Sequence, residues 1–418
     1  MKKRHLLSAV LTMAVATNAL AAGYQLQEYS VTGLGRAFAG AGVMGDDYSA
    51  IAFNPAGMSL VEKSGVQMGA IAVDVYGKVK GESQPRGAAQ PKAGQTHSNL
   101  FRLLPHFYGQ HKVNDKLDLG LGLYVPFGLA NDYKNGWFGE EHAGYSGITV
   151  VDLTPSVSYK ILESLSVGLG LNLQYTVAHL TGAIYGGGST NMHDADDIGV
   201  GYNVGLTWKP TKTTRFGVSY RSKVNHKLQG KNSANAGIYA PFVGTTFLNG
   251  THKVNAKITT PETVIFSAAQ DLGEKWTVSG IARYTRWSRF DVLDIYQENK
   301  PTPGPLSRTI EHWRNTWLLG IGADYKACKN LTFRFGTAWD NTAIRSAKYR
   351  TARIPDERRI WASIGASYMK NNWQFDIGYS HLFVHSAKAE GTALNSGTFN
   401  AKYHIQSNIL GMGLQYKF

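Results

Sequence analysis

The chain has 418 residues, of which 47 are glycine, and a formal net charge of +14. After its N-terminal segment it has no run of about 18 apolar residues, the length that a membrane-spanning helix needs, which excludes a helical inner-membrane protein. Its basic residues are spread along the chain and form no basic helix, so we expect no nucleic-acid partner.

The N-terminus has the pattern of a secretory signal peptide. Basic residues at 2–4 precede an apolar stretch over 6–16, and residues 19–21 form an A-x-A cleavage site. We therefore expect residues 1–21 to be removed on export, so that the mature chain begins at Ala22.

Residues 22–63 do not alternate as strands do. They are rich in glycine and contain Asp46, Asp47 and the sequence Asn54-Pro55-Ala56-Gly57. A segment this irregular would leave backbone groups unpaired if it faced lipid. We predict that it forms a small N-terminal hatch, or plug, because the lumen of a barrel of about fourteen strands is wider than side chains alone can fill.

Residues 64–418 alternate between apolar and polar side chains in one segment after another. In 165–176 the odd positions are leucine, valine or tyrosine, and the even positions are small or polar. This period of two places one side of each strand in lipid and the other in the lumen. The predicted fold is all-β, an antiparallel transmembrane β-barrel of about fourteen strands, an even number that permits closure. Candidate strands begin near residues 64, 99, 116, 147, 164, 199, 213, 254, 274, 312, 330, 358, 372 and 404.

Short and long connections alternate along this region, as they do in outer-membrane barrels with short periplasmic turns and long extracellular loops. Both chain ends then lie on the periplasmic side. The terminal Phe418, with Tyr416 and Leu414 at alternate positions before it, resembles the signal read by the barrel assembly machinery. The expected long loops span residues 77–98, 128–146, 182–198, 225–253, 291–311, 341–357 and 387–403.

Several motifs together resemble the FadL-like long-chain fatty-acid transporters of the outer membrane, a family (OmpP1/FadL/TodX) that includes aromatic-hydrocarbon channels. The resemblance implies a monomer with a hatch, an apolar groove between extracellular loops, a lumen pocket near the N-terminus, and lateral release through a kink in the third strand. It also implies passive diffusion. The motifs are Ala22–Leu26, Gly33–Gly40, Asp46-Asp47, Asn54-Pro55-Ala56, Pro261-Glu262, Tyr284–Ser288, Ile354-Pro355-Asp356, Arg359 and Trp361.

This resemblance assigns roles to three groups of residues. The N-terminal gate would be formed by Ala22, Gly23, Tyr24 and Leu26, and the hatch motif by Gly35, Arg36, Asn54, Pro55 and Ala56. In the third strand, Gly120 and Gly122 could permit a kink that interrupts pairing. Glycine also occurs in strands that are simply packed closely against a neighbour, and this alternative stays open.

Apolar residues in the predicted loop 225–253 are unusual for a segment that faces water, and a hydrophobic ligand would explain them. The alternative is a lid packed on a neighbouring loop. The candidate capture residues are Ile238, Tyr239, Phe242, Val243, Phe247 and Leu248, with Ile184 and Tyr185 as the opposite wall.

A fatty-acid carboxylate would need a fixed cation in an otherwise apolar pocket. Strand parity directs Arg221, Arg283 and Arg334 toward the lumen. Most arginines in barrel lumens pair with carboxylates of the plug or the wall, so each has this structural alternative.

The sequence has no G-x-S-x-G, no HExxH and no paired cysteines, so we expect no enzyme, no metal and no cofactor. The predicted function is passive uptake of hydrophobic compounds, foremost long-chain fatty acids, across the Gram-negative outer membrane. A polar-solute porin and a surface adhesin or receptor are the alternatives. Lipopolysaccharide and outer-membrane lipid are the other expected partners.

Overall fold

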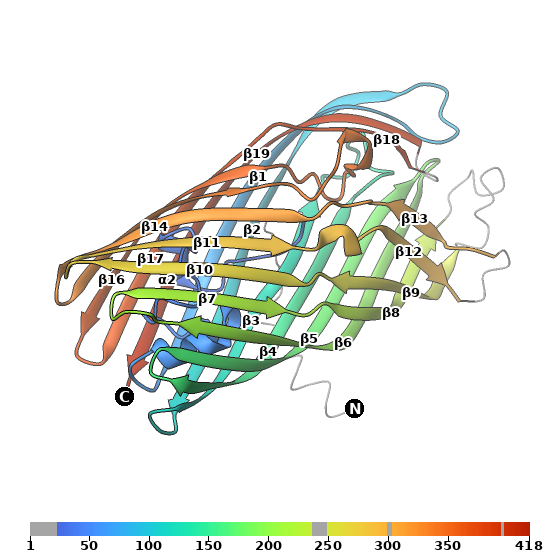
Figure 1. Cartoon of the computed structure of the whole chain (residues 1–418). Coiled ribbons are helices and arrows are strands. Elements are labelled where there is room, and N and C mark those ends of the chain that lie inside the picture. The colour runs from blue at the N-terminus through green and yellow to red at the C-terminus, as the bar shows by residue number, and fades with distance from the viewer. Residues whose placement is uncertain (1–22, 236–248, 299–302, 394–396) are drawn as a thin grey trace.

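The computed structural model describes residues 23–235, 249–298, 303–393 and 397–418. Among these residues, no helix is both long and apolar enough to cross a membrane. The described chain is dominated by one antiparallel sheet that closes on itself (Figure 1).

The sheet is a closed barrel of 14 strands, which confirms the predicted fold class. Five strands are interrupted, so their halves carry separate labels. Closure pairs the first and last strands, with Gly65 opposite Lys417 and Gln84 opposite Thr398. In chain order the segments are β1 (Gly65–Gln84), β2 (Lys92–Lys112), β3 (Leu117–Asp132), β4 (Tyr145–Leu162), β5 (Leu165–Ile184), β6 (Gly188–Trp208), β7 (Thr214–Arg221), β8 (Val224–Asn235), β9 (Gly250–Thr260), β10 (Thr263–Leu272), β11 (Trp276–Thr285), β12 (Val292–Gln297), β13 (Ser307–Ile310), β14 (Thr316–Cys328), β15 (Leu331–Asp340), β16 (Arg359–Lys370), β17 (Trp373–Val384), β18 (Ala387–Ala393) and β19 (Gly397–Lys417).

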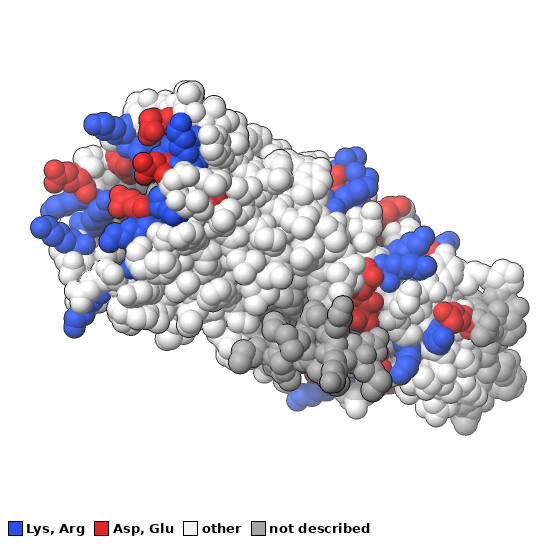
Figure 2. Space-filling model, turned by 90° about the horizontal axis from the view of Figure 1, so that it is seen from below, with Lys and Arg blue, Asp and Glu red and all other residues white. Residues whose placement is uncertain are grey.

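The outer face of the barrel is apolar in its middle section. Ile198, Ile321 and Met412 are 62%, 67% and 61% exposed, whereas inward-facing Gln174 and Thr176 are fully buried. Figure 2 shows charged side chains at the two ends of the barrel and an almost uncharged band between them. This distribution is the one that hydrocarbon demands, since a charge facing lipid costs several kcal/mol at the bilayer centre, roughly 2–4 for Lys or Arg.

Several strands are longer than the sequence indicates, and five expected loops are partly wrong. Strand β5 runs directly into β6 through the turn at 185–187, although a loop was expected over 182–198. Strand also occupies much of the expected loops 77–98, 225–253, 291–311 and 387–403. The physical reason is that these sections extend beyond the apolar band, where outward side chains are polar and the alternation that marks a lipid face disappears.

The N-terminal segment, residues 23–63, lies against the inner face of the wall. It contains α2 (Val31–Gly35), α3 (Ala50–Phe53) and the 3-10 helix η1 (Pro55–Leu60). Inward-facing hydroxyls of the wall donate to its backbone, for example Ser219 Oγ to the carbonyl of Phe53 at 2.7 Å and Ser267 Oγ to that of Ala41 at 2.8 Å. These hydroxyls satisfy carbonyls at the end of a short helix and in a turn of the segment.

Candidate functional site: the N-terminal segment and the wall beside it

Residues Gly23–Leu26 are paired with the wall like a short additional strand. Gln25 forms an antiparallel bridge with Phe127 of β3. The amide of Leu26 donates to the Pro126 carbonyl and the amide of Gly128 to the Tyr24 carbonyl, both at 2.8 Å. The start of the described chain is therefore attached directly to β3 at an irregularity of that strand.

That irregularity interrupts the barrel wall. Strands β2 and β3 pair only from Phe107 opposite Leu123 to Lys112 opposite Asp118. The register of β3 against β4 shifts between Tyr124 and Phe127, around Pro126. A proline has no amide to donate, so it ends ladder pairing at this position. Above Leu123 the third strand no longer pairs with the second.

The interruption comes later in β3 than Gly120 and Gly122, the two residues at which the kink was predicted from the sequence. Gly120 and Gly122 are regularly paired with both β2 and β4. A Cβ on Gly120 would lie 2.5 Å from Met58 Sδ and 2.9 Å from Ile51 of the N-terminal segment. The kink is therefore not at these glycines, whose lack of a side chain lets the N-terminal segment approach the wall.

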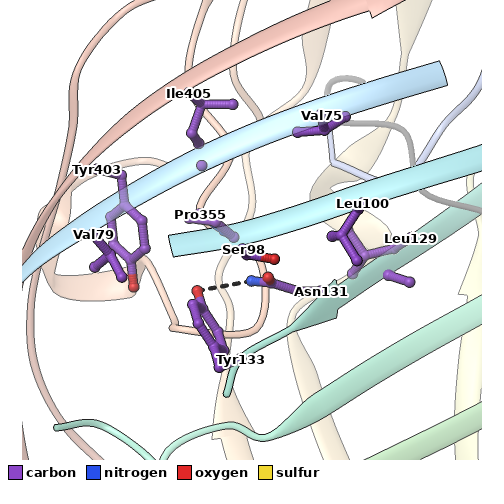
Figure 3. Close-up of a pocket in the computed structure, with 12 residues that line it drawn as sticks. Val75, Val79, Ser98, Leu100, Leu129, Asn131, Tyr133, Pro355, Tyr403 and Ile405 are labelled. Atoms are coloured by element: carbon purple, nitrogen blue, oxygen red, sulfur yellow. Dashed lines mark hydrogen bonds between the residues drawn. The ribbon is translucent and has the colours of Figure 1, made fainter. Parts of the chain in front are cut away.

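A small, partly open cavity of about 30 Å³ lies at the separated part of β2 and β3. Figure 3 shows its lining, which is mostly aliphatic and comes from four strands. Its polar side is formed by Asn131, which donates to the Tyr133 hydroxyl at 2.8 Å. The lining residues are Val75, Gly77 and Val79 of β1, Ser98 and Leu100 of β2, Leu129, Ala130 and Asn131 of β3, Tyr133, Pro355, and Tyr403 and Ile405 of β19.

Four aromatic rings surround Tyr24. The ring centroids of Trp287, Phe290 and Trp313 lie 4.6, 5.6 and 5.9 Å from that of Tyr24, and Phe127 lies at 6.0 Å. All five side chains are buried. We call this group the aromatic cage; edge-to-face geometry of this kind is favourable beyond its buried area.

Only glycine fits at position 23, because the backbone is left-handed there and the rings of the aromatic cage leave no room for a side chain. Its φ of +68° lies in the left-handed region, and a Cβ would come within 2.4 Å of Trp313 and 2.9 Å of Trp287. No residue with a side chain fits there without moving an indole ring.

Two buried carboxyl groups adjoin the same segment. The Gly23 amide donates to Asp356 Oδ2 at 3.2 Å, and Trp313 Nε1 donates to Glu311 Oε2 at 2.8 Å. Burial raises the pKa of Asp356 to about 6 and that of Glu311 to about 7. Both groups therefore titrate near neutral pH, unlike exposed carboxylates.

The three lumen arginines differ in their partners. Arg221 forms an ion pair with Asp152 and donates to the Tyr124 hydroxyl at 2.8 Å. Arg334 binds Asp324 and Asp46 at 3.2 and 3.1 Å. Arg221 and Arg334 are therefore structural ion-pair residues and not free ligand contacts, because each guanidinium is already paired with carboxylates of the wall or of the N-terminal segment.

Arg283 differs from both. Its side chain is 3% exposed, and among the described residues its Nε and Nη1 have no hydrogen-bond partner. Both polar atoms of the Gln27 side chain are buried without a partner as well. Two residues along the same face of β11, Thr285 donates to Gln25 at 2.8 Å. Arg283 therefore lies beside the N-terminal segment, and two of its buried donors have no partner among the described residues.

The hatch-motif residues all contact the wall or stabilise the local fold. A Cβ on Gly35 would be 3.0 Å from Gly365 of β16, and Arg36 binds Asp46 and Asp324 at 2.7 and 3.1 Å. Asn54 caps η1, with Pro55 at its first turn, and donates from Nδ2 to the Leu206 carbonyl at 3.1 Å. The Ala56 carbonyl accepts from Ser158 at 3.2 Å.

Most of the expected capture loop is beyond what the structure describes. Ile238, Tyr239, Phe242, Val243, Phe247 and Leu248 lie outside the described residues, as does Ala22. Ile184 ends β5 and Tyr185 begins the following turn, where its ring is 3.9 Å from a Cβ built on Gly87. The contact of Tyr185 is thus with the connection between β1 and β2.

Sequence reasoning missed the aromatic cage and Pro126. Trp287 and Asp356 stood inside quoted motifs but were given no role, because nothing local indicates which distant residues they meet. Pro126 was a usable signal, since a proline within an alternating run marks a bulge or an edge. Among the described residues, no cluster of three or more His, Cys, Asp or Glu side chains could hold a metal ion.

A family model described as outer membrane protein transport protein (OMPP1/FadL/TodX) matches residues 12–418. The chain is 29% identical to a putative outer membrane protein of Neisseria meningitidis serogroup B, with 97% of each chain covered. It is 26% identical to the long-chain fatty acid transport protein of Escherichia coli K12, covering 98% of this chain and 97% of the relative. A crystal structure of a Pseudomonas aeruginosa FadL homologue superposes with a TM-score of 0.87 at 24% identity, over 95% of this chain and 100% of the other. The Pseudomonas putida toluene transporter TodX superposes with a TM-score of 0.67 at 16% identity, over 89% and 94%.

Proposed function

Because the chain belongs to the OMPP1/FadL/TodX family of outer membrane transport proteins, we propose that it takes up long-chain fatty acids by passive diffusion. The family establishes a transporter of hydrophobic compounds in the Gram-negative outer membrane. The fatty acid is our proposal, motivated by the E. coli relative and by the buried donors of Arg283 that have no partner among the described residues.

The observation that carries this proposal is the hydrogen bonding of Tyr24 and Leu26 to β3 at Pro126 and Gly128. This pairing connects the aromatic cage to the point where the wall is interrupted. A ligand that displaces Tyr24 from its cage would break these bonds and free the separated section of β3. In the proposal, residues 23–63 act as a hatch that blocks the axial route, and the ligand leaves sideways.

The lateral route is supported by what faces outward beside the gap. Phe101 and Leu103 of β2 are 62% and 49% exposed and lie above the last β2–β3 pair. In the proposal, this part of the separation faces lipid, so an apolar molecule leaving there would enter hydrocarbon directly.

The head group would bind at Arg283. A carboxylate there would fill two unpartnered buried donors, while the alkyl chain would lie among the rings of the aromatic cage above Gln25. Charge-assisted bonds to a guanidinium are about twice as strong as neutral ones, so the site would favour a carboxylate over an alkane of equal length.

We would test the head-group site by equilibrium binding of radiolabelled oleate and of a long alkane to purified protein. Arg283→Met keeps most of the side-chain volume and removes the charge. Oleate affinity should fall about tenfold or more, the equivalent of one or two charged hydrogen bonds, and alkane affinity should stay unchanged. An unchanged oleate affinity would remove Arg283 from the site.

We would test the route by oleate uptake into cells that lack their own transporter. Ala130 lines the cavity and is 5% exposed, so Ala130→Trp should fill the gap and abolish most uptake while oleate still binds. The matched control is Ala362→Trp on the lipid-facing side of β16. Normal uptake by Ala130→Trp would refute lateral release, and steady ion conductance in planar bilayers would favour the porin alternative.

A further inference from the structure

The outer face of the wall formed by β18, β19 and β1 carries a row of lysines. Lys80 of β1 lies opposite Lys402 of β19, and Lys402 lies opposite Lys388 of β18. All three side chains are exposed. Figure 1 shows the three strands next to one another in this part of the barrel. Directly opposite side chains have Cβ atoms about 5 Å apart, so like charges there are destabilising unless an anion lies among them.

A second row lies nearer the membrane. Lys78 is opposite His404 on one side and His97 on the other, and all three are exposed. Within the described ranges, no ion pair joins Lys78, Lys80, Lys388 or Lys402 to a carboxylate. We call these four residues the lysine patch.

Three carboxylates share this face but lie in other rows. Glu82 and Glu390 flank Asn400, one row farther from the membrane, and Asp74 is opposite Asn408, two rows nearer to it than Lys78. The lysine patch therefore occupies a positive zone between acidic side chains, which gives it a defined height on the barrel.

That height is the level of lipid headgroups. Tyr76 and Phe383 lie on either side of Gln406 and are 45% and 56% exposed, as outward aromatic residues are at a membrane interface. Lys78 and Lys80 follow Tyr76 by two and four residues, which places them roughly 7 and 13 Å farther along the strand at about 3.3 Å per residue. Flexible lysine stems can reach down to phosphates just above the apolar band.

We propose that the lysine patch binds a lipid of the outer leaflet whose headgroup carries two phosphates. The row from Lys80 to Lys388 spans two strand spacings, about 10 Å, which is wide enough for two phosphate groups to lie among the three ammonium groups. A headgroup with two phosphates would therefore compensate the row more fully than one phosphate, while the acyl chains lie along the exposed aromatic residues below. Lysine binds phosphate as a compact charge with three donors, and no particular headgroup orientation is required.

The lysine patch lies on the outer side of strands whose inner side lines the cavity. Val79 and Tyr403 line the cavity from the inner face of the same two strands that carry Lys78, Lys80 and Lys402 outside. A bound lipid would thus stand against the wall next to the lateral opening. The binding itself does not depend on the proposed transport of fatty acids.

The test is native mass spectrometry of the purified, folded barrel in detergent, titrated with bisphosphorylated lipid A. The variant is Lys80→Gln with Lys388→Gln and Lys402→Gln. Each lysine near an anionic lipid surface contributes about 1 kcal/mol, so affinity should fall on the order of a hundredfold. The control carries the same charge loss at the other mouth of the barrel, at the exposed residues Lys275, Lys329 and Lys370, and should bind within about threefold of the parent. Heat-modifiable migration on gels checks that both triple variants are folded.

Three further ligands test whether the site recognises two phosphates on one lipid. Monophosphorylated lipid A and phosphatidylglycerol should bind at least tenfold more weakly than the bisphosphorylated lipid, because each lacks one phosphate. Equal binding of either would refute a two-phosphate site. Inorganic phosphate competing at similar concentration would show a free-anion site, and equal losses in both triple variants would show general charge attraction; either result overturns the proposal.

Discussion

The two ends of the N-terminal segment are held by opposite kinds of contact. Near the mouth that carries the C-terminus, Arg36 and Arg334, 3% and 4% exposed, share the carboxylates of Asp46 and Asp324. At the other end, Tyr24 is held by aromatic rings and a few backbone hydrogen bonds.

From this difference we infer which end of the segment a ligand could displace. Separating buried opposite charges costs several kcal/mol, so the ionic cluster anchors the segment. The aromatic cage holds Tyr24 by apolar contact, which a hydrophobic ligand can replace with contact of the same kind. An anchored end and an exchangeable end are what a ligand-displaced hatch requires.

The largest expected effect comes from breaking the ionic cluster. Arg36→Met leaves Asp46 and Asp324 with one arginine between them and should lower the free energy of unfolding by about 3–5 kcal/mol. Guanidinium unfolding followed by tryptophan fluorescence measures it. The control is Arg308→Met, which breaks the exposed pair with Asp294 and should have no measurable effect. Equal stability of both variants would mean that the cluster is no anchor.

A smaller effect is expected at the other end. Gly23→Ala places a Cβ against Trp313 and forces a left-handed conformation on alanine, which should cost about 1–3 kcal/mol locally. The N-terminal segment should detach and become accessible to protease while the barrel stays folded. If instead the whole barrel loses stability as in Arg36→Met, the two ends are not independent.

The ends should also differ in their response to pH. Burial raises the pKa of Asp356 to about 6 and of Glu311 to about 7, so the folded state favours their protonated forms. Their destabilising effect is absent well below about pH 4, where both are protonated in the folded and in the unfolded state. It grows as the pH rises from about 4 to 7 and is constant above that. At the other end, burial opposes ionisation of Asp46, but Arg36 outweighs it and lowers the pKa of Asp46.

We therefore expect the protein to be more stable at pH 5 than at pH 8 by on the order of 1–2 kcal/mol. Glu311→Gln keeps an acceptor for Trp313 and should reduce this difference, whereas exposed Glu390→Gln should not. Unfolding titrations at the two pH values give the answer. A stability that rises toward pH 8 would contradict the assignment.

The smallest expected effect distinguishes two roles for Gly120 in the third strand, which are close packing against the N-terminal segment and flexibility of the wall. Gly120→Ala introduces a Cβ that Met58 must avoid by rotating, and should cost about 1 kcal/mol. Gly77→Ala, whose Cβ meets nothing closer than 3.9 Å, should be neutral. If Gly120→Ala leaves stability intact but lowers oleate uptake, the glycine serves wall flexibility and not close packing.

The sequence by itself determined the barrel. Alternation in segments such as 165–176 requires that one face meet lipid, and backbone hydrogen bonding in lipid then requires closure into an even-numbered sheet. The alternation failed where strands rise above the apolar band, as in 182–198, because water is compatible with polar side chains on both faces.

Only the tertiary structure decided the site. Arg221, Arg283 and Arg334 all point into the lumen, yet among the described residues two of them form ion pairs with carboxylates and Arg283 forms none, which depends on strands far apart in sequence. The meeting of Tyr24 with Trp287 and Trp313, and the break at Pro126 beside it, follow from how the N-terminal segment threads the lumen. Local periodicity fixes which way a side chain points, and the global arrangement of the strands fixes what it meets.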